Sequence, residues 1–571
     1  MKAFTEPLLS LAGFEEMTKT AEKSSGLISV TGCIDAQKSQ MIYAFGGHRK
    51  NKLIVTFGEQ KAKELYDEYS FFDKEVVYYP SKDVLFYQSD IRGNLLTAER
   101  IRALKAIREQ ERVTIVTTFD ALMNTMAPIE KMWENVLTLE QGQLLDLKEI
   151  QAALIRMGYE KEYQVQTMGQ FSVRGGILDV FPLTEENPIR IELWGDEIDT
   201  IRYFDCESQK SIENTDRVSI YPAAELVLSD EEKAGGIDKL KAEAKRVSDK
   251  LRKQMKTEEA HRVSVMADEL TEEWGELSMY AGMDAFLSYF FDERVGLLDY
   301  FKPSDSLIFF DELTRCTEQG KLTETEFSES MKQRLAMGYI LPGQMNGLFT
   351  EKEIVAKLEK YSCIALAALD NKANGLHQLG SYGIHCQSVS PYNNSFELLI
   401  KDLKRYKKNG YRVILLSGSR TRAKRLSEDI TDQGITCFYT ENYDHELFEG
   451  QIMVCYGKVR RGFEYPILKF AVITESDIFG AQQKKKKRHR TYEGEKIQSF
   501  TDLSVGDYVV HENHGLGIYR GIEKLEVDKK VKDYIKIEYQ GGSNLYILAT
   551  QLDMIQKYAG KDARKPKLNK L

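Results

Sequence analysis

The chain has 571 residues, of which 42% are hydrophobic and 29% charged, and this balance excludes a mostly disordered protein. At roughly 100–200 residues per domain, the length predicts three to five domains. No run of about 18 apolar residues occurs, and the N-terminal stretch is too acidic and too weakly apolar for a signal peptide, so we expect no membrane association. The seven cysteines form no CxxC pair, which argues against a zinc ribbon or a disulfide scaffold and favours reduced thiols in the cytoplasm.

The net charge of −9 is unevenly distributed along the chain. Residues 484–571 contain 19 Lys and Arg against 12 Asp and Glu, a net charge of +7, so the preceding residues carry −16. A chain with this balance has no broad basic surface for nucleic acid by charge alone.

Residues 1–130 predict the first part of an α/β domain. Apolar runs alternate with helical stretches, and strands separated by helices favour a parallel sheet covered by helices. The expected strands are Leu27–Val30, Leu53–Thr56, Val76–Tyr79 and Val113–Thr117.

Residues 131–222 change to short strands separated by turn residues, which predicts an antiparallel β-rich domain inserted into the α/β domain. Helices rich in Lys and Glu follow, and then an apolar strand, Leu307–Phe310, that ends in two acidic residues. We therefore expect residues 223–345 to form the second part of the first domain.

Three segments complete the expected organisation. Residues 350–480, with a strand at Cys363–Ala367, predict a small doubly wound α/β domain. Residues 481–498 contain KKKKRHR and predict a basic linker. Residues 499–560 have short alternating strands punctuated by glycines, which fit a five-stranded barrel-like domain of about 60 residues, and residues 561–571 would begin a further linker.

The first strand leads into an incomplete phosphate-binding loop. The stretch from Gly32 to Ser39 has the frame G-x-x-x-x-G-K-[ST], but Gln37 occupies the position of the second glycine. That glycine lets the backbone turn its amides toward the phosphates, in a conformation that is costly for a residue with a Cβ. Lys38 and Ser39 could still supply a charge and a hydroxyl, but we expect a relic rather than a working site.

The strand LIFFDE resembles a Walker B strand, in which Asp311 would hold magnesium and Glu312 would orient water. Taken alone, an ordinary buried strand with an acidic end is the better interpretation. Together with the damaged loop, it indicates a decayed nucleotide-binding fold.

The stretch FSVRGGILDVFP places Arg174 immediately before a Gly-Gly turn, where its side chain would point outward. Arg190 and Trp194 lie four residues apart on a nearby strand, so the period of two puts both on one face. Arg and Trp on one face of a sheet are typical of a protein-binding hot spot, although a surface Arg beside a core Trp is an equal alternative.

His511 and His514 flank Glu512 with a spacing that resembles a metal site. No third ligand is apparent, so we expect no metal there. The sequence shows no Ser/His/Asp or Cys/His combination that would indicate hydrolytic or redox chemistry.

With these motifs in order, the chain resembles the N-terminal half of the bacterial transcription-repair coupling factors along essentially its whole length. The stretch FSVRGGILDVFP, the segment Met279–Tyr300 and the LIFFDE strand are similar to the excision-repair protein UvrB. The segments VGDYVVHENHGLGIYRGI and LYILATQLDMIQKY resemble the Tudor-like domain of the CarD regulators. The resemblance therefore implies an α/β multidomain fold: a UvrB-like domain with a degenerate P-loop and an inserted β-rich domain, a small α/β domain, and a C-terminal Tudor-like β-barrel.

The resemblance also implies an adaptor with two partners. The inserted domain would bind the damage-recognition ATPase UvrA through Arg174, Arg190 and Trp194, the last at a position where the family often has Phe. The Tudor-like domain would bind the β subunit of RNA polymerase through Leu525, with Ile522 and Lys524 beside it.

The family's motor domains would follow Leu571. ATP, magnesium and most DNA contacts are expected of that motor, which in the complete protein would displace stalled polymerase. For this chain itself we expect no enzymatic activity, no cofactor and no metal.

Three alternatives come from other functional classes. A DNA-loading ATPase like UvrB would need Gly at position 37 and helicase motifs after Asp311, and the sequence has neither. A free-standing CarD-like transcription regulator would account for residues 499–571 but not for the rest. A DNA-binding reading of KKKKRHR implies only weak, salt-sensitive affinity.

Overall fold

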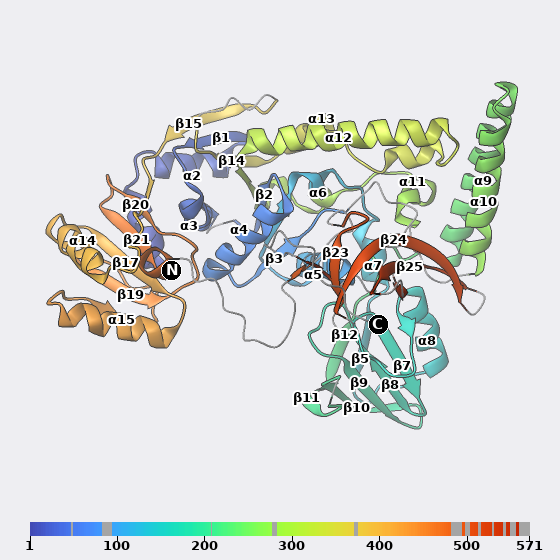
Figure 1. Cartoon of the computed structure of the whole chain (residues 1–571), viewed down its shortest axis with the longest axis horizontal. Helices are drawn as coiled ribbons and strands as arrows, with labels where there is room; N and C mark the ends of the chain where they lie inside the picture. The colour runs from blue at the N-terminus through green and yellow to red at the C-terminus, as the bar shows by residue number, and fades with distance from the viewer. Residues whose placement is uncertain are drawn as a thin grey trace.

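The computed structural model describes residues 1–46, 49–82, 94–206, 208–276, 283–369, 375–480, 494–496, 503–511, 515–527, 530–540, 544–548 and 555–558 (Figure 1). Most of the expected linker 481–498 and all of 561–571 lie outside this part of the chain, as do Glu512 and His514. No helix among the described residues is long and apolar enough to cross a membrane.

A seven-stranded sheet forms the first domain, in the order β15-β1-β14-β13-β2-β4-β3. Its strands are β1 (Gly26–Thr31), β2 (Asn51–Thr56), β3 (Val76–Tyr79), β4 (Val113–Thr118), β13 (Ser306–Asp311), β14 (Ser362–Leu366) and β15 (Gln378–Gly383). Every pairing is parallel, as predicted, and the central strands are buried along almost their whole length. Burial on both faces explains why these strands appear in the sequence as continuous apolar runs.

Helices and 3-10 turns cover this sheet. They are α1 (Lys2–Thr5), η1 (Glu6–Ser10), α2 (Phe14–Lys23), α3 (Asp35–Gly46), α4 (Glu59–Phe72), α5 (Asn94–Glu109), α6 (Phe119–Met123), η3 (Leu297–Tyr300), η4 (Pro303–Asp305), α12 (Leu313–Ala336), η5 (Pro342–Asn346) and α13 (Glu351–Leu358). Figure 1 shows α12 running along the top of the molecule.

The structure differs from the sequence analysis in where the first sheet ends. The strand expected at Cys363–Ala367 was assigned to the second α/β domain, beginning at residue 350. Instead, β14 lies between β1 and β13 and pairs with both, and β15 pairs with the other side of β1. The boundary between the two α/β sheets therefore falls after Gly383. An apolar run identifies a buried strand, but it carries no information on which distant strand it joins.

The inserted segment forms a separate, β-rich domain (teal in Figure 1). Helix α7 (Ile129–Glu134) leads into it and packs in the core of the first domain. The elements of the inserted domain are β5 (Leu137–Glu140), α8 (Leu147–Arg156), β6 (Glu160–Lys161), β7 (Gln170–Arg174), β8 (Ile177–Val180), β9 (Ile189–Trp194), β10 (Glu197–Phe204), β11 (Ser211–Thr215) and β12 (Arg217–Ile220). Strands β6 to β11 form one sheet in sequence order, and β5 pairs with β12. Leu154 of α8 shares a core with Phe171, Leu178 and Ile191, so one face of the sheet is packed and the other is free to face solvent.

A long helical hairpin follows the insertion. It consists of α9 (Asp230–Lys253) and α10 (Thr257–Glu276), with η2 (Met283–Phe286) and α11 (Leu287–Phe290) packed at its base. Ser229 and Glu232 cap the start of α9 with a reciprocal pair of hydrogen bonds. The hairpin has its own small core, in which the Trp274 ring lies 5.0 Å from that of Phe286.

The second α/β sheet has the order β16-β20-β21-β17-β19-β18. Its elements are β16 (Gln387–Ser388), α14 (Phe396–Lys408), β17 (Arg412–Ser417), α15 (Arg420–Asp432), β18 (Phe438–Tyr439), β19 (Ile452–Tyr456), β20 (Phe463–Tyr465), β21 (Phe470–Thr474) and α16 (Glu475–Phe479). Leu416 and Phe463 belong to the same hydrophobic core as Phe4 and Phe71 of the first domain. The two α/β domains are therefore joined through a shared core.

The C-terminal strands form an antiparallel sheet in the order β22-β27-β23-β24-β25-β26. They are β22 (Gly494–Lys496), β23 (Tyr508–His511), β24 (Gly515–Val527), β25 (Lys530–Glu538), β26 (Asn544–Leu548) and β27 (Ile555–Tyr558). The sequence predicted five strands closed into a barrel. In the described part of this domain no pairing joins β26 to β22, so the order is that of an open sheet.

Candidate functional site

The outer face of the inserted sheet brings the expected arginines together. Asp179 on β8 lies directly opposite Arg190 on β9, and Arg174 on β7 lies opposite Ile177. Because side chains alternate along a strand, Arg174, Asp179, Arg190 and Trp194 all point to the same side. The shared face of Arg190 and Trp194 is as the sequence predicted.

Asp179 organises this face. Its Oδ1 accepts a hydrogen bond from Arg190 Nε at 2.7 Å, and its Oδ2 accepts from Arg190 Nη2 and Arg174 Nη2, both at 2.8 Å. Arg190 Nη2 also donates to Gln209 Oε1 at 2.8 Å, and its guanidinium lies 4.3 Å from the centre of the Phe204 ring. A planar guanidinium held on several sides is fixed in orientation before any partner arrives.

The three expected binding residues differ in exposure. The side chain of Arg190 is 13% exposed and that of Arg174 is 37% exposed, whereas the Asp179 side chain is only 1% exposed. Trp194 is 84% exposed, at the end of β9. The sequence predicted that Arg174 points outward; it lies on the outer face, where its Nη2 donates to Asp179 Oδ2. Trp194 is therefore the most exposed of the three side chains, and Arg190 is the most enclosed.

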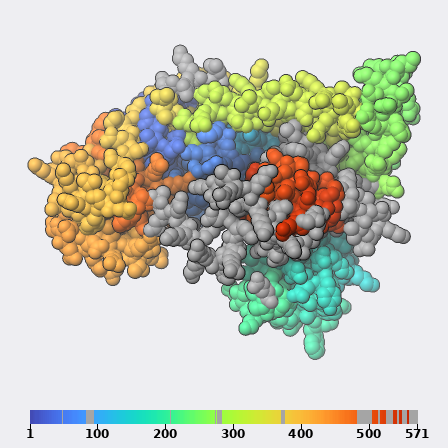
Figure 2. Space-filling view, viewed as in Figure 1, coloured from blue at the N-terminus to red at the C-terminus, as the bar shows by residue number. Residues whose placement is uncertain are grey.

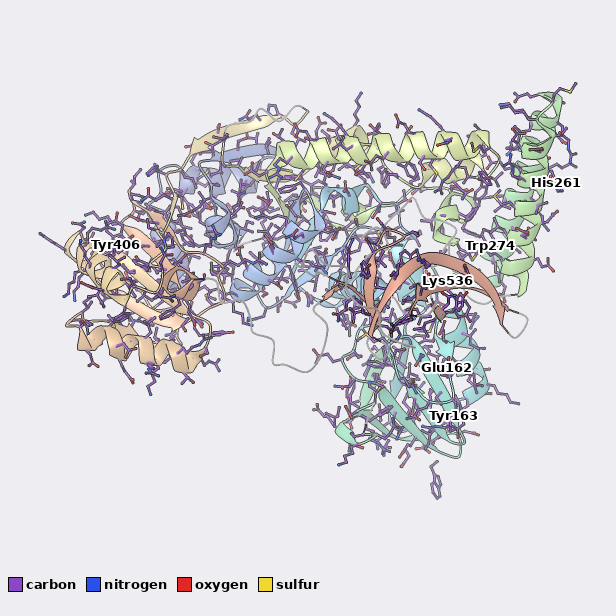
Figure 3. All side chains as sticks on the ribbon, in the orientation of Figure 1. Glu162, Tyr163, His261, Trp274, Tyr406 and Lys536 are labelled. Carbon is purple, nitrogen blue, oxygen red and sulfur yellow. The ribbon has the colours of Figure 1, made fainter. Side chains whose placement is uncertain are left out.

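Sequence reasoning missed several residues of this face. Asp179 was inside the quoted motif and at an outward position, so the alternation could have identified it. Gln209 and Tyr163 come from loops that carry no such pattern; Tyr163 is 83% exposed, and its carbonyl accepts a hydrogen bond from Ser172 on β7 (Figure 3).

The P-loop-like junction between β1 and α3 is filled by the protein's own groups. Lys38 Nζ donates to Asp311 Oδ1 at 2.5 Å, to Glu312 Oε1 at 3.0 Å and to Asp35 Oδ1 at 3.1 Å. Thr56 Oγ1 donates to the other oxygen of Asp311 at 3.0 Å. Burial alone would lower the pKa of Lys38, but the surrounding carboxylates raise it above its usual value. Lys38 is therefore a charged, fully paired cation.

The backbone amides of the loop are also engaged. Gly32 N–H donates to the Ala368 carbonyl at 3.2 Å, and Cys33 N–H donates to the Ala367 carbonyl at 3.0 Å. Gly32 has a φ of +78°, and a Cβ there would lie 2.1 Å from the Ile384 carbonyl oxygen. The loop after β14 and the residues after β15 thus occupy the space in front of the loop. The residues at this junction do not form an open cradle for a nucleotide and magnesium.

In the C-terminal sheet, β24 is longer than its neighbours. Its first residues pair with β23, whereas Ile522–Val527 pair only with β25 among the described residues. The register shifts at the bulge around Gly521, which has a φ of +102°. Figure 1 shows β24 and β25 continuing as a curved two-stranded ribbon beyond the rest of the sheet. The side chains of Lys524 and Leu525 lie outside the described part; Ile522 is half-buried against the small core, and His511 is buried.

Comparison with known proteins identifies two of these regions. Residues 137–226 match the family model of the UvrB interaction domain, which covers the sheet that carries Arg174, Arg190 and Trp194. Residues 503–559 match the family model of the CarD-like/TRCF RID domain, which covers β23 to β27.

Curated relatives match nearly the whole chain. It is 31% identical over 522 residues to the transcription-repair-coupling factor of Bacillus subtilis, covering 91% of this chain and 44% of the relative. It is 30% identical to the protein of the same name from Staphylococcus haemolyticus, covering 95% and 46%, and 29% identical to that of Staphylococcus aureus, covering 98% and 47%. The chain thus spans a little less than half the length of the curated relatives it matches.

Proposed function

We propose that the chain is an adaptor in transcription-coupled DNA repair, connecting stalled RNA polymerase to UvrA. The observation that carries this proposal is the presence, on one chain, of a UvrB interaction domain and a CarD-like domain in a sequence similar to transcription-repair-coupling factors over 91% or more of its length. The relatives are about twice as long, and we assign ATP-driven DNA translocation to the complete protein rather than to these residues. We place the adaptor in the cytoplasm.

UvrA binds the outer face of the inserted sheet in this proposal. Two oriented arginines and an exposed tryptophan are the side chains that dominate protein interfaces. The buried carboxylate of Asp179 supports the proposal, because it holds both guanidinium groups in place without a partner and so lowers the cost of ordering them on binding.

RNA polymerase β binds the ribbon of β24 and β25. An unpaired strand edge can accept a strand of another protein, and Ile522–Val527 offer such an edge within the described part. Leu525, in the charged neighbourhood of Glu523, Lys524 and Glu526, would supply an apolar contact.

A binding assay with purified UvrA and RNA polymerase tests both ends of the adaptor. Arg174→Ala should weaken UvrA binding at least tenfold, since truncating an interface Arg costs about 2 kcal/mol. Arg156→Ala is the matched control, because Arg156 is exposed on α8, which packs against the opposite face. Leu525→Arg should remove polymerase binding while circular dichroism and melting stay unchanged. Wild-type protein that binds neither partner would refute the adaptor, and a Leu525→Arg variant that unfolds or binds normally would remove Leu525 from the contact.

We further propose that this chain does not hydrolyse ATP. The paired state of Lys38 and the engaged amides of Gly32 and Cys33 support this, and they also weigh against a UvrB-like ATPase. A CarD-like regulator remains the second candidate, favoured only by the match at residues 503–559. It would bind polymerase but not UvrA.

A further inference from the structure

Helix α9 and the turn after it carry a dense row of cations. Between residues 239 and 256 the sequence has eight Lys and Arg against two acidic residues, although the whole chain has a net charge of −9. All eight side chains are exposed: Lys239, Lys241, Lys245, Arg246, Lys250, Arg252, Lys253 and Lys256. Over its whole length α9 has eight Lys and Arg against six acidic residues, so the excess of positive charge lies in its second half and in the turn after it.

The cations occupy the side of α9 that faces solvent. Leu240, Ala244 and Leu251 are buried in the core of the hairpin. With about 3.6 residues per turn, Lys245, Arg246 and Lys253 project from the opposite side. In Figure 1 the hairpin (green) stands at the end of α12 and rises past the rest of the chain, and Figure 2 shows it forming an edge of the molecule.

Most of these cations have no acidic partner. Among the described residues, Lys239 Nζ lies 3.0 Å from Asp292 Oδ1 and Arg252 Nη1 lies 3.9 Å from Asp249 Oδ1. The other six have no carboxylate within 4.0 Å in the same part of the chain. Cations in the last turn of a helix stabilise it through the helix dipole. That effect accounts for the basic residues near Lys253, but not for Lys245 and Arg246 in the middle of the helix.

The partner helix carries the opposite charge. From Thr257 to Glu276 the sequence has seven acidic residues and one arginine. An anionic ligand would therefore be attracted to α9 and repelled by α10. Five of the seven acidic residues of α10 lie between Asp268 and Glu276, away from the turn, so the cations of α9 have few acidic neighbours on α10.

We propose that the solvent side of α9 binds the phosphate backbone of double-stranded DNA without sequence preference. From Lys239 to Lys253 the cations of α9 extend over roughly 21 Å at about 1.5 Å per residue, which is a rod-like array suited to a charged duplex. The paired helices are about 20 Å across, too wide for a major groove of about 12 Å, so base edges are out of reach. A protein partner fits less well, because interfaces need several large apolar anchors, and among residues 239–256 the only large exposed apolar side chain is Met255, in the turn after α9.

This DNA contact is separate from the proposed UvrA and polymerase surfaces, since it lies on neither the inserted sheet nor the C-terminal sheet. It can therefore be tested without either protein. The probe is a fluorescein-labelled duplex of about 30 base pairs, titrated with the full chain at salt concentrations from about 50 to 200 mM. A second duplex of unrelated sequence checks for sequence preference.

The test variant replaces Lys245, Arg246, Lys253 and Lys256 with Gln. Its matched control replaces Lys401, Lys404, Lys407 and Lys408 of α14 with Gln, because these lysines are also exposed and the charge change is identical. We expect the α9 variant to lose at least tenfold in affinity, and its slope of log K against log salt to fall by about 3 to 4, one unit for each lost phosphate contact. The α14 variant should bind within about twofold of wild type.

A variant with only two substitutions distinguishes a loss of DNA contacts from a folding defect. Lys245→Gln with Arg246→Gln changes only residues before the last turn of α9 and should show about half the change in slope. The proposal is overturned if wild type does not bind DNA at about 50 mM salt, or if both four-residue variants lose affinity equally. Loss of UvrA or polymerase binding by the α9 variant, with no DNA binding by wild type, would assign the cations to a protein partner and also overturn it.

Discussion

Two regions of the molecule use a buried aspartate to hold cations, and they use it in opposite ways. At the P-loop-like junction, Asp311 pairs with Lys38, and both side chains are 1% exposed. On the inserted sheet, Asp179 is equally buried, yet its partners Arg190 and Arg174 remain 13% and 37% exposed. In the first case the charge pair is enclosed within the protein. In the second, it holds side chains in position on an open surface.

The difference follows from what lies in front of each aspartate. The segments after β14 and β15 cover the junction, whereas nothing among the described residues covers the outer face near Trp194. A cation enclosed with its carboxylate contributes to folding, because removing it leaves a buried charge without a partner. Removing a cation held at the surface lowers the free energy of unfolding by less, but it weakens the binding of a partner. This contrast can be tested by substitution.

The largest expected effect is at the closed junction. Lys38→Ala should lower the free energy of unfolding by about 3–5 kcal/mol, because Asp311 and Glu312 would lose their shared cation inside the protein. Arg190→Ala should lower the free energy of unfolding by a smaller amount, because Asp179 would still accept a hydrogen bond from Arg174. Chemical denaturation of the two variants measures the difference. Adding Asp311→Asn to Lys38→Ala should recover part of the loss.

The melting temperature in the presence of nucleotide provides a second test of the closed junction. Because Lys38 is already paired, ATP with magnesium should not raise the melting temperature of the wild-type chain. A clear rise that Lys38→Ala abolishes, or equal costs for Lys38→Ala and Arg190→Ala, would contradict the contrast between the closed and the open site.

A third buried carboxylate tests what happens when the cation is distant. Glu68 on α4 faces the second α/β domain, where Arg460 Nε lies 4.0 Å from its Oε1. Burial raises the pKa of Glu68 to about 7, although Arg460 and Lys61 oppose the shift. The folded protein then binds a proton that the unfolded chain has released, between the unfolded pKa near 4.5 and the folded value. Stability should therefore fall by about 3 kcal/mol as the pH rises through this window.

Glu68→Gln should remove that pH dependence, since the amide does not titrate. Unfolding in urea at several pH values between about 4.5 and 7.5 measures it. A wild-type profile with the same slope as the Gln variant would show that Arg460 keeps Glu68 ionised. In that case Glu68 would behave like Asp179 rather than as an isolated buried acid.

The sequence could predict the elements that carry both sites. It could not predict that the junction is closed while the outer face of the inserted sheet is open. Gln37 stands where the motif needs a residue without a Cβ, and from this the sequence predicts a damaged loop. The carbonyls of Ala367 and Ala368 that engage the loop come from a segment more than 330 residues away, which local patterns do not reach. For the same reason, β14 was assigned to the wrong sheet.

On the inserted sheet, alternation was sufficient to place Arg190 and Trp194 on one face. It could not show that both arginines turn toward Asp179, because the direction of a long side chain depends on cross-strand neighbours and not on the period of the strand. The exposure of Trp194 was left open for the same reason, and the sequence allowed a core tryptophan equally well.

The smallest expected effect on stability is at Trp194. Because this side chain is 84% exposed, Trp194→Ala should change the free energy of unfolding by no more than about 0.5 kcal/mol. Under the proposed function, the same substitution should weaken UvrA binding about tenfold or more, since an aromatic anchor buried at an interface contributes chiefly to the complex. Phe448→Ala is the matched control, because Phe448 is also an exposed aromatic, at 56%, but lies in the second α/β domain. Calorimetric titration with UvrA and thermal melting of both variants separate the two effects. If Trp194→Ala binds UvrA like the Phe448→Ala variant, the open face does not use its aromatic anchor; if it melts several degrees lower than wild type, Trp194 stabilises the fold and the contrast between the closed and open sites fails.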